Sequence, residues 1–236
     1  MITVLDNHQG HHLQQQGWQA RLWLAPDFAI LHGQLRATAS HAHYAHQWMH
    51  SAGAPFTVEL SGQRHTVRQL LIASQQPHAI VDAPAPVLTV YAEPLRLSVA
   101  ALRKAVASAD PDSMAATLQA QPWSILPEPR LQRALMEVDA LLSGKVSAAA
   151  VAEAAHLSLS QLERLFTAQL GLPVRRLVLW RRLRLAIRLI LLGSNLTQAA
   201  HAAGFADAAH FSRTMRSLFG VRADHSLRQL DVTVLD

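Results

Sequence analysis

Cysteine is missing from the 236 residues of the sequence, and charged residues are sparse. The lack of cysteine excludes disulfide bonds and cysteine-based zinc sites, and it favours a reducing compartment such as the cytoplasm. Charged residues make up 16% of the chain and apolar residues 50%, which predicts a globular rather than a disordered protein. The sequence also lacks three patterns typical of enzymes: a glycine-rich phosphate-binding loop, a pair of catalytic carboxylates and a Ser-His-Asp triad. We therefore do not expect an enzyme.

Long uncharged hydrophobic runs are missing too. The most apolar stretch, residues 177–192, contains four arginines, Arg181, Arg182, Arg184 and Arg188. Four arginines at the centre of a bilayer would be very costly, so this stretch is predicted to be a packed helix and no membrane partner is expected. Residues 1–17 lack the basic start and apolar run of a secretory signal, which also agrees with a cytoplasmic location.

Positive charge is concentrated in the second half of the chain. Residues 1–127 contain seven Lys and Arg and seven Asp and Glu, whereas residues 128–236 contain fourteen and nine. The whole net charge of +5 therefore lies in the second part. Histidines show the opposite distribution, because ten of the fourteen precede residue 127. A basic region is typical of polyanion binding, so the split predicts two parts with different functions.

The first half is predicted to form a β-sandwich or β-barrel. Short runs rich in β-branched and aromatic residues alternate with proline and glycine, as in all-β folds. The expected strands are residues 18–24, 28–35, 56–60, 66–72 and 87–91. Helical spacing follows over residues 95–107, and a short helix is expected near Ser113. The apolar stripe of the first helix fits either a subunit contact or the surface of the barrel.

The second half is predicted to be helical throughout. Three prolines between residues 121 and 129 predict a domain boundary. Beyond this boundary, N-cap residues and helix-ending glycines predict a series of helices. Ser158 and Gln161 are expected to form a capping box at the start of one of them. The expected helices are residues 131–142, 148–155, 158–170, 174–192, 197–203 and 207–219, and a last one near 223–230.

Two segments of this helical half repeat one pattern. Residues 147–171 and 195–220 each contain a cap, a short alanine-rich helix, a tight turn, a second helix, an aromatic residue and a glycine. This is the layout of a helix-turn-helix, whose second helix can lie in the major groove of DNA. The helix between them, residues 174–192, would be about 28 Å long. It could hold two reading helices apart by roughly one turn of DNA, about 34 Å.

Three stretches of the helical half carry a specific sequence pattern. They are HLSLSQLERLFTAQLG, VRRLVLWRRLRLAIRLILLG and NLTQAAHAAGFADAAHFSRTMRSLFGV. The most specific positions are Gly204, Phe205, His210, Phe211, Ser212, Arg213, Phe219, Gly220 and Val221. Over roughly residues 131–230 the sequence resembles the AraC/XylS family, which implies a DNA-binding regulator, such as an activator, of transcription. By this resemblance, the DNA-contacting positions are Ser160, Glu163, Arg164, Ala208, Ala209, Ser212 and Arg213, with Arg216 facing phosphate.

Two features depart from the family pattern. His156 stands where the first turn usually has glycine, so a histidine is expected to adopt a positive φ at some energetic cost. Ala208 and Ala209 can only touch a thymine methyl group, so direct readout by the second unit is expected to be poor. We expect Glu163 and Arg164 to carry more of the base specificity. The second unit is expected to contribute mainly phosphate contacts and shape readout.

Histidines in the first half form a second pattern. The segment His41-Ala-His43-Tyr-Ala-His46-Gln47 is followed much later by His78. Histidines at i and i+2 on a strand point to the same face, and a third from a distant strand would complete a set suited to zinc, nickel, copper or iron. This order resembles the cupin pattern and implies a cupin-like barrel with His41, His43 and His78 as metal ligands. Gln47, a weaker ligand, stands where that pattern has an acid.

The sequence thus predicts an α+β protein in three parts. Residues 1–94 would form a cupin-like β-barrel that acts as the sensor, 95–129 a helical linker with a role in dimerisation, and 130–236 a DNA-binding domain of two helix-turn-helix units. The effector would be a small molecule or a divalent transition metal in the barrel. Further partners under this interpretation are RNA polymerase at a promoter and a second copy of the chain. Two alternatives stay open, a cupin-type metalloenzyme such as a dioxygenase and a constitutive DNA-binding protein whose barrel only dimerises.

Overall fold

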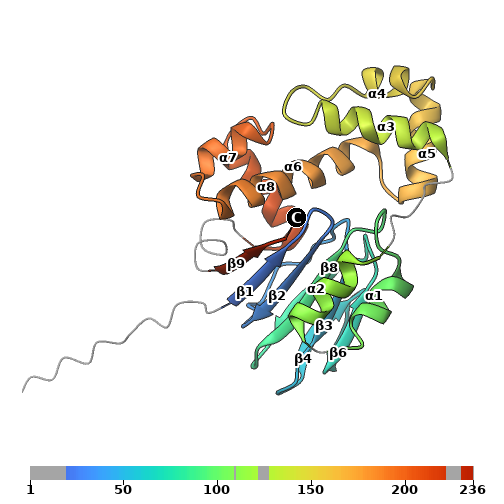
Figure 1. Cartoon of the computed structure of the whole chain (residues 1–236). Coiled ribbons are helices and arrows are strands. Elements are labelled where there is room, and N and C mark those ends of the chain that lie inside the picture. The colour runs from blue at the N-terminus through green and yellow to red at the C-terminus, as the bar shows by residue number, and fades with distance from the viewer. Residues whose placement is uncertain (1–19, 109, 122–127, 222–229, 236) are drawn as a thin grey trace, which may run out of the picture.

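The computed structural model describes residues 20–108, 110–121, 128–221 and 230–235. Apart from β9, strands precede helices along the chain, as predicted, and α3–α8 form a helical domain beside a β domain that includes α1 and α2 (Figure 1). The strands are β1 Ala20–Leu24, β2 Phe28–Gly33, β3 His46–His50, β4 Phe56–Leu60, β5 Gln63–Val67, β6 Gln69–Ile72, β7 His78–Asp82, β8 Val87–Ala92 and β9 Leu230–Val234. The helices are α1 Val99–Ala105, α2 Pro111–Gln119, α3 Pro129–Ala140, α4 Ala148–Ala154, α5 Leu159–Leu170, α6 Val174–Leu191, α7 Leu196–Ala202 and α8 Ala208–Phe219.

The β domain consists of two sheets rather than a closed barrel. One sheet has the strand order β6-β3-β8-β2-β1-β9 and the other β5-β4-β7. The strand expected over residues 66–72 is two strands, because the chain changes sheets at Arg68 between β5 and β6. Apolar side chains of both sheets, among them Met49, Phe56 and Val87, fill the space between them. The resulting open sandwich is compatible with the cupin-like prediction.

Strands β3 and β7 were not predicted. For β3 the reason is that both of its faces are buried. Trp48 packs in the core under α1 and α2, whereas its neighbour Met49 packs between the two sheets. Because both faces of β3 are covered, Gln47, Trp48 and Met49 are all buried and the strand shows no alternation of polar and apolar residues.

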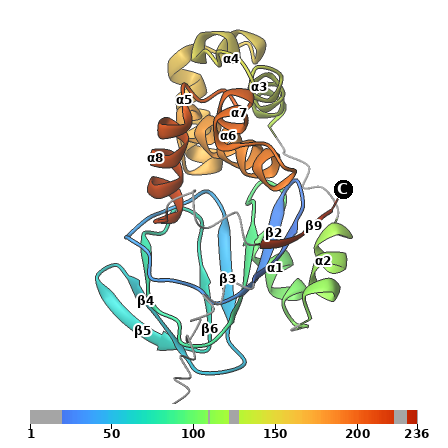
Figure 2. The same ribbon diagram turned by 90° about the vertical axis from the view of Figure 1, so that its left-hand side faces the viewer.

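Strand β9 corrects the prediction for the end of the chain. A helix was expected near residues 223–230, of which 223–229 lie outside the described residues. Leu230 instead begins a strand that pairs in parallel with β1 at the edge of the six-stranded sheet. Thus a segment that follows the helical domain returns to the β domain (Figure 2).

Helices α1 and α2 cover one face of the six-stranded sheet. Leu102 of α1 and Met114 and Leu118 of α2 are fully buried in one cluster with Trp23 and Phe28. The apolar stripe of α1 is therefore covered by the β domain. The helix itself begins at Val99, so residues 95–98 of the expected helix lie outside it.

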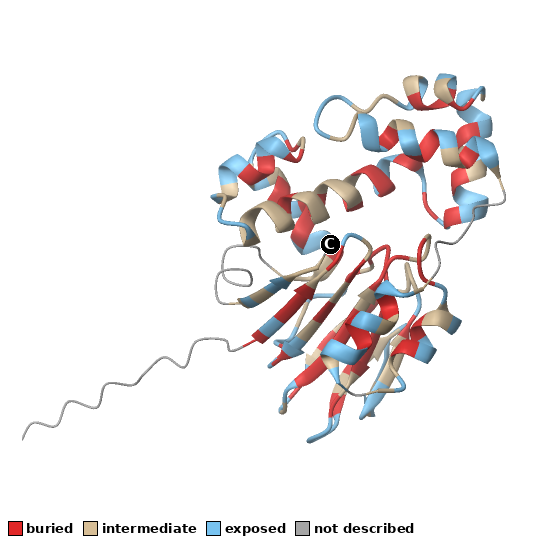
Figure 3. Cartoon of the chain, viewed as in Figure 1, coloured by how far each residue is buried: buried red, intermediate tan, exposed pale blue. Residues whose placement is uncertain are grey.

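The helical domain, α3 to α8, is arranged around α6. This helix of 18 residues runs between α3–α5 at one end and α7–α8 at the other (Figure 1). Leu177, Leu183 and Ala186 of α6 are fully buried against both groups. The outward faces of the surrounding helices are exposed (Figure 3). Among the described residues, no helix is both long enough and apolar enough to cross a membrane.

The two predicted helix-turn-helix units are present and locally alike. A side chain caps each helix, Ser147 and Ser158 in the first unit and Asn195 and Asp207 in the second, and the predicted capping box of Ser158 with Gln161 is present. In the turn between α4 and α5, His156 has a φ of 54°, and in the turn between α7 and α8, Gly204 has a φ of 77°. The expected positive φ of His156 is thus confirmed.

Candidate functional site

The predicted DNA-contacting residues lie in two groups, on α5 and on α8. On α5, Ser160 and Arg164 are exposed and Glu163 is half-buried. The Arg164 guanidinium donates from Nε to the Ser160 carbonyl oxygen at 3.3 Å and leaves its other donors available to a partner. Helix α5 thus presents one cation and one carboxylate next to each other on its outer face.

Helix α8 has two faces with different contacts. On the outer face Ala209, Arg213 and Arg216 are exposed, and Ala208 and Ser212 are half-buried. On the inner face Phe211, Met215 and Leu218 are buried in the core of the helical domain. The N-terminus of the helix is capped by Asp207, whose carboxylate accepts from the His210 amide. The helix is therefore held rigidly while its arginines face outward.

The C-terminal end of α8 rests on the β domain. Gly220 ends the helix with a φ of 69°, and its carbonyl oxygen accepts a hydrogen bond from the Ala39 amide at 3.3 Å. A Cβ at Gly220 would lie 2.5 Å from the Ala39 carbonyl oxygen and 2.8 Å from Nδ1 of His41. Only glycine can make this approach, so the end of α8 directly contacts the loop that carries His41.

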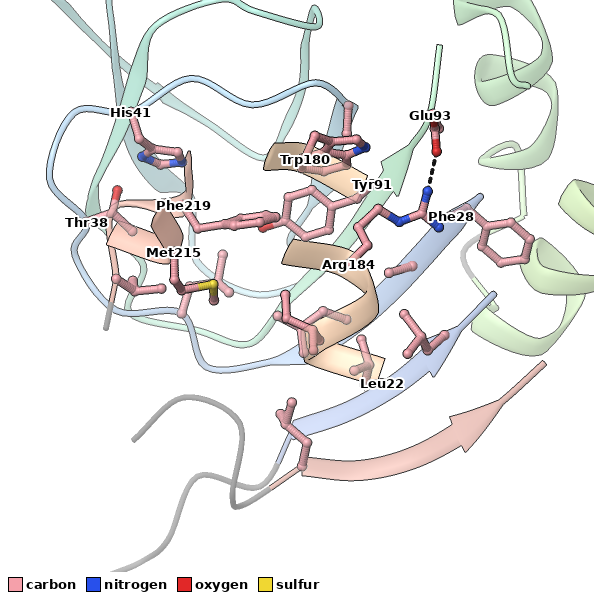
Figure 4. Close-up of a pocket in the computed structure, with 18 of the residues that line it drawn as sticks. Leu22, Phe28, Thr38, His41, Tyr91, Glu93, Trp180, Arg184, Met215 and Phe219 are labelled. Carbon is pink, nitrogen blue, oxygen red and sulfur yellow. Dashed lines mark hydrogen bonds and ion pairs between the residues drawn. The ribbon is translucent and has the colours of Figure 1, made fainter. Parts of the chain in front are cut away.

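A cavity of about 200 Å³ lies between the two domains (Figure 4). Its walls come from β1, β2 and β8 on one side and from α6 and α8 on the other. Most of the lining is apolar, and the residues labelled in Figure 4 are Leu22, Phe28, Thr38, His41, Tyr91, Glu93, Trp180, Arg184, Met215 and Phe219. No sequence pattern pointed to this cavity, because its walls come from segments as far apart as Leu22 and Val221.

An ion pair joins the domains at the side of this cavity. Arg184 of α6 donates from Nη1 to a carboxylate oxygen of Glu93, and from Nη2 to the Ala25 carbonyl oxygen at 3.3 Å. Burial raises the pKa of the Glu93 carboxyl, and the nearby Arg184 and Arg181 oppose that rise. Glu93 and Arg184 also line a second, more polar cleft of about 400 Å³, which extends toward Leu135 and Asp139 of α3. The pair therefore separates an apolar cavity from a polar cleft.

The histidines predicted to bind metal are brought together in the β domain. His41, His43 and His78 are buried, and one ring nitrogen of each lies within 4.8 Å of those of the other two. The fourth predicted residue, Gln47, is also buried, and Nε2 of His43 lies 3.1 Å from its side-chain amide oxygen. His41 and His43 were expected on one strand. Instead, His41 forms an isolated bridge with His78 and His43 lies in the loop before β3.

All three imidazoles of this cluster are kept neutral. Burial lowers the pKa of His41 to about 4 and that of His43 to about 3, and the nearby His78 lowers both further. Burial also lowers the pKa of His78. At neutral pH each ring therefore carries one proton, which leaves one ring nitrogen with a lone pair.

Comparison with known proteins addresses the helical domain. The family model described as "Helix-turn-helix domain" matches residues 151–229. The transcriptional activator RhrA of Rhizobium meliloti (strain 1021) is 37% identical over 108 residues, which are 44% of this chain and 34% of RhrA. The match to the family model falls on the two units described above. The chain carries an AraC-type DNA-binding domain. It spans about a third of the length of the curated relative that it matches.

The fold of the whole chain, with its AraC-type domain, is similar to that of ToxT from Vibrio cholerae. A ligand-free ToxT variant from strain SCE256 aligns with a TM-score of 0.59 and 12% identity, covering 85% of this chain and 97% of ToxT. Wild-type ToxT with a bound unsaturated fatty acid aligns with a TM-score of 0.54 and 12% identity, covering 83% and 93%. At this identity the likeness concerns the fold, namely a β domain followed by helix-turn-helix units.

Proposed function

We propose that this chain is an effector-controlled transcription regulator that acts in the cytoplasm. Both helix-turn-helix units of its AraC-type domain would bind one face of an operator, and a small molecule in the cavity between the domains would control that binding. The observation that carries the proposal is the double role of α8. Its outer face presents Arg213 and Arg216, while Met215 of the same helix lines the cavity.

The DNA contacts are assigned by exposure and chemistry. Arg164 on α5 and Arg213 on α8 are exposed and can each donate two parallel hydrogen bonds to a guanine edge. Glu163 can accept from a cytosine amino group, and Arg216 neutralises a phosphate. The remaining positions would make close contacts with the DNA backbone or with thymine methyl groups; they are Ser160, Ala208, Ala209 and Ser212. Base readout would therefore be concentrated in the first unit, at Glu163 and Arg164.

The proposed effector has an apolar body and a carboxylate. ToxT, whose fold is similar, has been crystallised with an unsaturated fatty acid and with (E)-4-(8-methylnaphthalen-1-yl)but-3-enoic acid, both of which have this chemistry. In this chain the apolar lining suits the body, and Arg184 suits the carboxylate. A carboxylate that paired with Arg184 would compete with Glu93 for the guanidinium. It would thereby loosen the contact between α6 and the β domain.

The DNA-binding part of the proposal is tested by operator selection. Full-length protein would be used to select binding sites from a random DNA library, and the affinity for the selected site would then be measured by fluorescence anisotropy. Arg164→Ala and Arg213→Ala should each weaken binding by about 1–3 kcal/mol, or roughly 5- to 150-fold. Arg103→Ala removes an exposed arginine of α1, in the β domain, and should leave the affinity unchanged. Wild-type affinity in both helix variants would show that α5 and α8 do not read the site.

A further inference from the structure

The imidazole cluster in the β domain has the hydrogen-bonding pattern of a metal site. Nδ1 of His41 lies 2.9 Å from the Ala39 carbonyl oxygen, Nδ1 of His78 lies 2.9 Å from that of Gln76, and Nδ1 of His43 lies 3.2 Å from that of Ala45. A carbonyl oxygen can only accept, so each Nδ1 carries the proton and each Nε2 carries a lone pair. Backbone carbonyls orient metal-binding histidines in this same way.

The Nε2 atoms of this cluster have little else to bind. Nε2 of His78 is buried and has no hydrogen-bond partner among the described residues, although the residue is only 2% exposed. A buried polar atom without a partner carries a free-energy cost, so such an atom points to a missing ligand. Nε2 of His43 lies 3.1 Å from the end of the Gln47 side-chain amide, and with the proton on Nδ1 this amide must turn its NH₂ group toward Nε2. The ring centroids of His41 and His78 are 4.2 Å apart and those of His43 and His78 are 5.2 Å apart.

We propose that His41, His43 and His78 bind one divalent transition-metal ion through their Nε2 atoms, with Gln47 beside it as a fourth polar group. Three imidazoles suit Zn²⁺, Cu²⁺, Ni²⁺ and Fe²⁺ rather than Mg²⁺ or Ca²⁺, which prefer oxygen. All four side chains are uncharged, so the ion would bring two positive charges into a buried site. His41 lines the cavity between the domains, so a hydroxide or the anionic group of an effector can reach the ion from that side.

The location of the site connects it to the second reading helix. The Phe219 ring at the end of α8 lies 5.3 Å from the His43 ring and 5.8 Å from the Trp180 ring of α6. The Ala39 carbonyl that accepts from His41 belongs to the residue whose amide donates to Gly220. An ion that draws His41 and His43 toward His78 would therefore change the surface on which α8 ends. This consequence for operator affinity rests on the proposed function, whereas metal binding does not.

Metal binding is tested directly on untagged, full-length protein freed of metal with a chelator. Equilibrium dialysis against Zn²⁺ should give one ion per chain, and Co²⁺ should give visible absorption bands of a nitrogen-ligated site. His78→Gln and His41→Gln should each weaken Zn²⁺ binding by at least about tenfold. In the control variant His8, His11 and His12 are all replaced by alanine, because these three histidines lie close to one another in the sequence and could also bind metal. This triple variant should bind Zn²⁺ and Co²⁺ like the wild type.

A second variant keeps the test decisive if the glutamine variants fail to fold. Gln47→Glu adds a charged ligand beside His43, so it should tighten Zn²⁺ binding and change the Co²⁺ spectrum. The proposal is overturned if the wild type binds no stoichiometric metal, if only the triple N-terminal variant loses it, or if Gln47→Glu leaves both readouts unchanged. Operator affinity measured with Zn²⁺ and with chelator is a separate arm. If Zn²⁺ changes the operator affinity of the wild type but not that of His78→Gln, the link between the site and α8 is supported. If Zn²⁺ does not change the operator affinity of the wild type, that link is overturned, but the proposed metal site is not.

Discussion

At the scale of single residues, two equivalent turns differ in one side chain. His156 and Gly204 both have positive φ values, and each precedes a residue, Leu157 or Phe205, whose amide donates to a carbonyl five residues earlier. A positive φ costs a residue with a side chain about 1 kcal/mol or more, whereas glycine adopts it without a steric cost. The first turn therefore stores strain that the second does not.

We predict that His156→Gly raises the free energy of unfolding by up to about 1 kcal/mol. Urea unfolding followed by circular dichroism measures it. Gly204→Ala is the converse change, and it should lower the free energy of unfolding by more than about 1 kcal/mol, because a Cβ there would lie 2.8 Å from the Leu142 carbonyl oxygen. A stability loss in His156→Gly would mean that the histidine side chain makes a contact worth more than the strain.

The sequence predicted the role of a single residue correctly wherever that role depends on the backbone within a few residues of it. The capping box of Ser158 and Gln161 and the positive φ of His156 were predicted correctly, because capping and positive φ depend on nearby backbone. The approach of His41 and His43 to His78 was expected from the resemblance of this histidine pattern to that of cupins. Their placement on a bridge and a loop rather than on a strand was not, because loop geometry depends on contacts with β7 and α8.

At the scale of elements, α5 and α8 end alike but have different neighbours. Gly171 and Gly220 both end their helices in the left-handed conformation, with φ values of 72° and 69°. A Cβ at Gly171 would meet nothing within 4 Å, whereas a Cβ at Gly220 would meet the loop of the β domain that contains Thr38, Ala39 and His41. The two glycines therefore form a matched pair for measuring the docking of α8.

We predict that Gly171→Ala and Gly220→Ala both lose about 1 kcal/mol of stability from strain, and that Gly220→Ala loses at least about 1 kcal/mol more from the forced separation of α8 from the β domain. Urea unfolding gives the difference. Hydrogen exchange of residues 38–41 should increase in Gly220→Ala only. Equal stability losses and equal exchange in the two variants would show that the end of α8 is not docked on the β domain.

The helices could be predicted from the sequence far better than the strands. Apolar periodicity, caps and glycine stops mark α3 to α8 locally, so their order and approximate bounds were correct. Strand β3 shows no alternation because both of its faces are buried. Strand β9 has an alternating pattern from Leu230 to Val234, but its partner β1 lies at the other end of the chain, and no local signal reports such a pairing.

At the scale of the whole molecule, the buried imidazoles make stability depend on pH. In the metal-free protein the folded-state pKa is about 4 for His41 and about 3 for His43, against an ordinary 6.5. Below about pH 6.5 the unfolded chain therefore binds protons that the folded chain does not, and stability falls until the folded-state pKa values are reached. Glu93, whose pKa is raised by burial, acts in the opposite direction but is a single group.

We predict that lowering the pH from about 7 to about 5 costs the metal-free protein about 2 kcal/mol for each of His41 and His43. Urea unfolding at a series of pH values measures this slope. Saturating Zn²⁺ should stabilise the folded protein by a similar amount at pH 7 and at pH 5, because the folded-state pKa values of His41 and His43 lie below both and protons do not compete for their nitrogens in this range. A free energy of unfolding that stays flat between pH 7 and 5 would show that the imidazoles are not buried in neutral form.

The arrangement of the two domains could not be predicted from the sequence. Charge and residue type divided the chain into a neutral, histidine-rich part and a basic part, but β9 of the basic part pairs with β1 of the β domain. The cavity between them needs Leu22 and Tyr91 from strands, Trp180 from α6 and Phe219 from α8 to meet in space. Only the folded chain brings these side chains together, and they place the cavity beside α8.

The most direct test of the account is the affinity for the selected operator, measured by fluorescence anisotropy with and without a chain-length series of unsaturated fatty acids. At least one acid should change the wild-type affinity about tenfold, a coupling free energy of about 1.4 kcal/mol. Ile187→Trp fills the cavity from α6 and should abolish the response, whereas Leu192→Trp, at the exposed end of the same helix, should preserve it. Control of operator binding from the cavity is contradicted if no acid changes operator affinity, or if the response of Ile187→Trp equals that of the wild type.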